Sequence, residues 1–135
     1  MADLKALLSG ISKRQMKSDY WLDFDYKEIK FAELYNKKQV ACLLCPELEA
    51  VDFDLLITSL NEIEVSLKNH LSNHCDASDV IRGINSNMTE FGNSYYRVMA
   101  PKEVYPTPGI YWSFWFIVIN KNRGKAISLS GAACD

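Results

Sequence analysis

The chain has no hydrophobic run long enough to cross a membrane. The longest, residues 111–119, is about half the length that a membrane-spanning helix requires. We also expect no secretion signal, because Lys13 and Arg14 interrupt the first apolar segment before it reaches a useful length. We therefore expect a soluble, cytoplasmic protein that does not act at a membrane.

Signatures of catalysis and of phosphate binding are missing as well. The six glycines stand apart, so no glycine-rich loop is present to cradle a phosphate. Nothing beside Cys75 or any serine supplies the strained turn or oxyanion loop that an activated nucleophile requires. The chain is mildly acidic, with an isoelectric point of about 5.7. This disfavours a nucleic-acid partner, because neutralising phosphates requires clustered Lys and Arg. We expect a non-enzymatic protein with no catalytic residues and no cofactor.

Cysteine and histidine are scarce, at four and two residues. In a cytosolic protein we expect the cysteines to be reduced and packed as small apolar groups. Four residues nevertheless have the composition of a structural zinc site: Cys42, Cys45, His70 and His74. The 24 residues between Cys45 and His70 exceed the usual finger spacing about twofold. We therefore predict no metal site, and a small zinc-binding protein remains an alternative.

The first half of the chain contains helical, strand-like and ambiguous segments. Leucines and isoleucines at helical spacing predict an amphipathic helix over residues 3–16. Residues 20–26 alternate between apolar and polar, which predicts a half-buried strand with an acidic outer face. Residues 28–38 fit either a short helix or a second strand. Residues 39–45 form an apolar run before Pro46 and are interpreted as a buried strand.

The second half begins with an apolar stripe that steps by three or four and predicts a long helix over residues 52–74. Residues 75–93 are polar and predict a loop, with at most a short helix near 77–84. Strands are expected at 94–99, 110–119 and 125–130, the last two joined as a β-hairpin. Together these elements predict one α+β domain spanning residues 1–135. It would contain an antiparallel sheet of about five strands with helices packed on one face.

Charge is distributed unevenly along the chain. Residues 19–64 carry eleven carboxylates against four lysines, a local charge of −7. A concentrated field of one sign attracts a partner of the opposite sign, so we expect a basic protein partner. The predicted contact residues are six acids and one aromatic anchor from the proline-rich segment 100–109: Asp23, Asp25, Glu28, Glu33, Glu47, Glu49 and Tyr105.

Residues 111–130 consist of an apolar strand, a polar turn and a returning strand. This layout resembles the closing hairpin of small bacterial immunity proteins of polymorphic or contact-dependent growth inhibition toxins. The resemblance implies an inhibitor that binds and neutralises a cognate toxin domain, a basic nuclease in many cases. The acidic region 19–64 would then be the docking surface.

A second resemblance rests on two short motifs. Asp23-Phe-Asp-Tyr26 is similar to an aspartate–aromatic box in the repressor family of RNA polymerase III. Trp112-Ser113-Phe114, followed by Asn120-Lys121, is similar to a late strand of that family, and the order of the motifs agrees. This alternative implies a regulator that associates with polymerase subunits.

Overall fold

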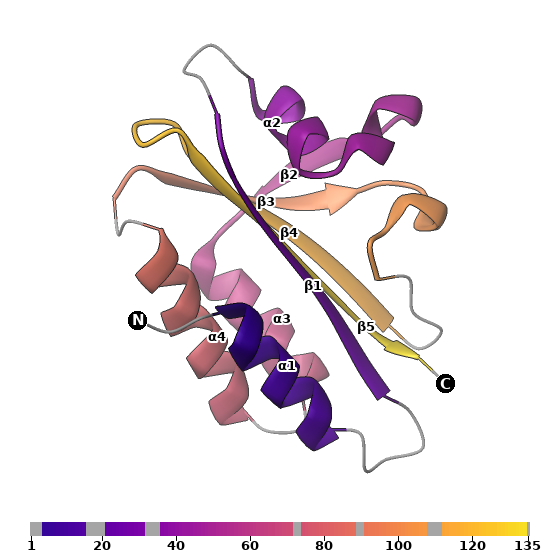
Figure 1. Cartoon of the computed structure of the whole chain (residues 1–135), viewed down its shortest axis with the longest axis vertical. Coiled ribbons are helices and arrows are strands. Elements are labelled where there is room, and N and C mark those ends of the chain that lie inside the picture. Colours follow the sequence, from indigo (N-terminus) through magenta and orange to yellow (C-terminus); the bar gives the residue numbers. More distant parts are fainter. Residues whose placement is uncertain are drawn as a thin grey trace.

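The computed structural model describes residues 4–15, 21–31, 36–71, 74–88, 91–107 and 112–134. Its centre is a five-stranded antiparallel sheet with the strand order β1-β5-β4-β3-β2 (Figure 1). The strands are β1 (Trp21–Lys30), β2 (Asp54–Thr58), β3 (Asn93–Met99), β4 (Trp112–Asn120) and β5 (Lys125–Cys134). The helices are α1 (Leu4–Gln15), α2 (Lys37–Leu44), α3 (Leu60–His70) and α4 (His74–Asn87), with 3₁₀ turns η1 (Pro46–Ala50) and η2 (Lys102–Val104). The predicted α+β class with five antiparallel strands is confirmed.

The predicted terminal hairpin is confirmed and forms the middle of the sheet. Strand β4 lies between β3 and β5, and every residue from Phe114 to Asn120 is buried. The turn depends on Gly124, which has a φ of +60°. A Cβ at this position would lie 2.6 Å from the carbonyl oxygen of Phe31, so only glycine fits without strain.

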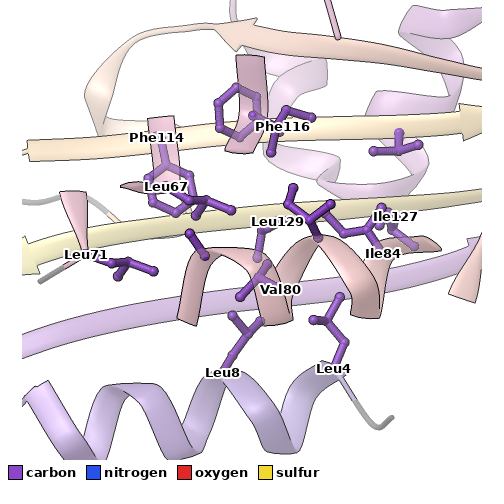
Figure 2. Close-up of a cluster of buried hydrophobic side chains, with 14 of the residues drawn as sticks. Leu4, Leu8, Leu67, Leu71, Val80, Ile84, Phe114, Phe116, Ile127 and Leu129 are labelled. Carbon is purple, nitrogen blue, oxygen red and sulfur yellow. The ribbon is translucent and has the colours of Figure 1, made fainter. Parts of the chain in front are cut away.

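Helices α1, α3 and α4 cover one face of the sheet, which we call the three-helix face. Figure 2 shows leucines of α1 and α3 and aliphatic residues of α4 meeting Phe114, Phe116 and Leu129. Complete burial of one such side chain contributes about 1.5–3 kcal/mol. This cluster therefore accounts for much of the stability, and α1 joins it as its apolar spacing predicts.

Helix α2 and turn η1 cover the opposite face, which we call the α2 face. Its buried cluster includes Val40, Leu44, Leu48, Trp115 and Ile117. The helices therefore lie on both faces of the sheet, whereas the sequence analysis predicted that all of them pack on one face.

The strand interpretation of residues 39–45 is wrong, because these residues belong to α2. The helix starts with a capping box: the Gln39 backbone N–H donates to Asn36 Oδ1, and the Asn36 backbone N–H donates to Gln39 Oε1, both at 2.8 Å. Val40, Ala41 and Leu44 then form its buried side. A short apolar run fits a buried helix as well as a strand, and the cap decides in favour of the helix.

The predicted long helix over residues 52–74 is also wrong. Residues 54–58 form β2, and α3 begins only after Ser59, whose hydroxyl accepts a hydrogen bond from the Glu62 backbone N–H at 3.1 Å. The predicted loop over 75–93 contains α4, whose buried residues recur at helical spacing: Ala77, Val80, Ile81 and Ile84. None of the described helices is both long and apolar enough to span a bilayer.

Candidate protein-binding surfaces

The predicted contact acids are divided between the two faces of the sheet. Successive residues of a strand point to opposite faces, so Asp23 and Asp25 lie on the α2 face whereas Glu28 lies on the three-helix face. Glu28 is ion-paired with Lys125 at 3.2 Å and accepts a hydrogen bond from the Tyr26 hydroxyl at 3.1 Å. The acids of residues 19–64 therefore do not form one continuous negative surface.

The α2 face retains part of the predicted set. Glu47 and Glu49 are exposed in the first turn of η1, and Asp23 is exposed on β1. These three carboxylates make no ion pair with any described residue. Glu33 lies outside the described residues.

The pKa of the buried Cys45 thiol is influenced by some of these charges. Burial is the main cause that raises the pKa of this thiol. The positive charge of Lys27 and a hydrogen bond with Ser128 lower the pKa, whereas the negative charges of Asp25 and Glu47 raise it further. Asp25 and Glu47 therefore approach the same buried thiol from β1 and η1, with the Lys27 ammonium nearby. Two of the predicted contact acids, Asp25 and Glu47, therefore influence one buried group on the α2 face.

The four candidate zinc ligands do not converge. Cys45 belongs to the buried cluster of the α2 face, whereas the His70 ring packs 6.0 Å from Phe114 on the three-helix face. Burial is also the main reason that the pKa of Cys42 is raised, which keeps that thiol protonated. The side chain of His74 lies outside the described part. Within that part, no group of three or more metal-binding side chains occurs.

Tyr105 contacts the core and also lines a groove. Its hydroxyl donates to the carbonyl oxygen of Val98 at 3.2 Å, and its ring meets Trp115 edge-on at 5.2 Å. The groove, of about 600 Å³, runs along β2, β3 and β4 beside α3. The predicted aromatic anchor is therefore held rigidly at one side of a cavity.

This groove combines apolar and charged side chains. Leu56 and Met99 are each more than two-fifths exposed, and Arg97 is exposed without an ion-pair partner among the described residues. Glu62, which accepts a hydrogen bond from the Thr58 hydroxyl, also lines it. Sequence reasoning missed Leu56 and Glu62 because it placed residues 52–74 in one helix.

The two short motifs meet in space. Phe24, from Asp23-Phe-Asp-Tyr26, and Phe114, from Trp112-Ser-Phe, lie on strands that flank β5, with ring centroids 6.4 Å apart. Both lie beside Gly131, the β5 residue that pairs with each of them. The segments thus form one structural unit although they are distant in sequence.

Comparison with known proteins finds similarity only at the level of the fold. No family model and no curated sequence matches the chain. A crystal structure of citrus MAF1 superimposes with a TM-score of 0.64 at 10% identity, covering 95% of this chain and 98% of that one. A second crystal form gives 0.67 at the same identity and coverage. The chain therefore has a MAF1-like fold.

This similarity corrects the interpretation as a toxin immunity protein. That interpretation depended on the layout of residues 111–130 alone, and an apolar hairpin with a polar turn occurs in many α+β proteins. The MAF1-like match extends over 95% of the chain. The interpretation as an immunity protein is therefore wrong, and a cognate toxin partner has no support.

Proposed function

We propose that this protein is a MAF1-like regulator that represses RNA polymerase III by binding the enzyme. The observation that carries the proposal is the fold shared with citrus MAF1 over nearly the whole length of both chains. MAF1 is a non-enzymatic repressor of RNA polymerase III. We therefore infer a protein that acts by occupying a polymerase surface rather than by chemistry.

The two sequence motifs add support that is independent of the superposition. Asp23–Tyr26 and Trp112–Phe114 resemble segments of the polymerase III repressor family, and they are adjacent through Phe24 and Phe114. Two short matches that fold into one unit are less easily produced by chance than two matches on separate surfaces.

The polymerase contact that we propose uses the unpaired part of the α2 face. Asp23, Glu47 and Glu49 are exposed and have no described counter-ion, so they are available to a cationic protein surface. Charges at the rim of an interface mainly change the association rate. We therefore assign these acids to recruitment, and Tyr105 to a rigid contact at the groove.

In vitro transcription tests the function directly. The purified protein is added to RNA polymerase III on a tRNA gene template, with RNA polymerase II on its own promoter as the specificity control. We expect fewer polymerase III transcripts, no change for polymerase II, and co-precipitation of polymerase III subunits with the protein. Unchanged polymerase III output together with no co-precipitation would refute the proposal.

Charge reversal tests the proposed contact separately. Asp23→Lys and Glu49→Lys should slow association with polymerase III and leave the melting temperature nearly unchanged, because both carboxylates are exposed. Asp79→Lys, on α4, is the control for a charge reversal at a distant place and should associate at the parental rate. Because it also removes the ion pair with Arg82, its melting temperature is measured alongside. If all three variants associate equally fast, the contact lies elsewhere.

A further inference from the structure

The two edges of the sheet differ in how they are protected against pairing with another chain. Strand β1 carries Asp23, Asp25, Lys27, Glu28 and Lys30, and α1 packs against it. Charged side chains on an edge strand oppose the addition of a further strand. The β1 edge is therefore protected.

Strand β2 has no comparable protection. Its sequence is Asp-Leu-Leu-Ile-Thr, with one charge at its start. The side chains of Leu56 and Ile57 are 44% and 84% exposed. In the described part of the chain β2 pairs only with β3, so alternate N–H and C=O groups on its other side point outward. This edge combines unused hydrogen-bonding groups with exposed apolar side chains.

The sequence of β2 is complementary to itself in antiparallel register. If two copies pair about an axis at Leu56, Leu56 meets Leu56, Leu55 meets Ile57, and Asp54 meets Thr58. Residues opposite each other in an antiparallel pair share a face. The apolar side chains would therefore meet one another on both faces, and no carboxylate would oppose another carboxylate.

The surroundings of β2 are compatible with this arrangement. The chain arrives from η1, which packs on the α2 face, and leaves into α3, which packs on the three-helix face. In an antiparallel pair of β2 strands, the start of one strand lies beside the end of the other. η1 of one copy therefore lies near α3 of the second copy, but on the opposite face of the sheet, so the two do not compete for space. Asp54 is already close to Lys38, at 3.7 Å, which reduces its repulsion of a second acidic chain.

We infer that β2 is a self-association site, through which two copies of this protein form one continuous antiparallel sheet. The occupant is a second copy because this one strand supplies both complementary halves, as an interface with two-fold symmetry requires. A contact through five residues per chain is small, so the dimer is weak and its population depends on concentration. The inference does not depend on the polymerase proposal.

Sedimentation velocity over about 1–500 μM tests the association. We expect the parent to shift from monomer to dimer across this range and Ile57→Lys to remain monomeric. Ile57 is mostly exposed, so circular dichroism and the melting temperature of the variant should match those of the parent. Phe91→Lys is the matched control, because Phe91 is 83% exposed at a different place, and this variant should dimerise like the parent.

Disulfide trapping tests the register in the full chain carrying Cys75→Ser. Opposed residues of an antiparallel pair have Cα atoms about 4.5–5.5 Å apart, within reach of a disulfide. Leu56→Cys should therefore cross-link to itself on oxidation, and Ile57→Cys should do so much less. A parent that stays monomeric throughout, an Ile57→Lys variant that dimerises normally, or equal trapping of both cysteine variants would each overturn the inference.

Discussion

Phe24 and Phe114 contact one another across Gly131, although they lie on strands that are not hydrogen-bonded to each other. The absence of a side chain at Gly131 lets the rings of β1 and β4 close over β5. A Cβ there would lie 2.5 Å from Phe114 Cζ and 2.8 Å from Phe24 Cδ1. This glycine therefore connects the two motifs on which the resemblance to the polymerase III repressors rests.

The first prediction concerns that contact. Gly131→Ala should lower the free energy of unfolding by about 1–3 kcal/mol, because the new methyl group overpacks the space between two rings. Urea denaturation measures the loss. Adding Phe114→Leu to Gly131→Ala should cost less than the sum of the two single changes, since the smaller side chain leaves room for the methyl group. Additive losses would contradict the steric explanation.

The second prediction concerns a buried hydrogen bond. The Trp115 indole Nε1–H donates to Ser128 Oγ at 2.8 Å, and both residues are at most 1% exposed. Ser128→Ala leaves that N–H without a partner and should cost about 1–3 kcal/mol in urea denaturation. Ser130→Ala is the matched control on the same strand and face. Ser130 Oγ is buried and has no partner in the described structure, so its removal should be neutral or stabilising.

The third prediction concerns thiol chemistry. Cys75 is exposed, whereas Cys45 is 1% exposed and burial raises its pKa. At neutral pH a thiol reagent should label Cys75 rapidly and Cys45 only as fast as the protein unfolds. Peptide mapping by mass spectrometry separates the two sites. Rapid labelling of Cys45 in folded protein would contradict the structure.

The same raised pKa predicts how stability depends on alkaline pH. The folded state holds the Cys45 proton more tightly than the unfolded state does. The contribution of this thiol to the free energy of unfolding is fully present below the ordinary cysteine pKa. It is lost as the pH rises through the higher pKa that the thiol has in the folded protein. Urea denaturation from neutral to alkaline pH should show this decline, and Cys45→Ala should reduce it. An equal decline in both proteins would exclude Cys45 as its source.

The fourth prediction concerns the start of α2. Asn36→Ala removes the side-chain acceptor for the Gln39 N–H and should cost about 0.5–2 kcal/mol. Thermal unfolding measures this loss of stability. Asn36→Asp retains an acceptor oxygen and should recover most of the loss. If Asn36→Ala unfolds at the parental temperature, the capping box contributes nothing to stability.

The sequence was informative where one periodicity persisted over a whole element. Strands β1 and β4 were recognised because alternation and continuous apolarity are local properties. Helix α2 was misassigned because the short apolar run after its Asn36–Gln39 cap fits a buried strand as well as a helix. Strand β2 was missed because Phe53 and Leu56 continue the spacing of α3 by coincidence, and the Ser59 cap marks the true start of the helix.

The candidate surfaces were predicted less completely for a different reason. The number of acidic residues is known from the sequence. The face of the sheet on which each acid of β1 lies depends on how far that strand extends. Because β1 extends without interruption to Lys30, parity alone places Glu28 on the face opposite Asp23 and Asp25. The groove beside β2 requires the order of strands in the sheet, which is set by contacts between distant segments and is not a local property of the sequence.

The unequal sheet edges have a further consequence for the size of any assembly. Once two molecules have joined through β2, the outermost strand at each end of the ten-stranded sheet is the charge-rich β1. Neither end then offers a surface on which a third molecule can be added in the same way. Growth therefore stops at two, and the protein avoids the open-ended fibres that unprotected strands on both sides would permit.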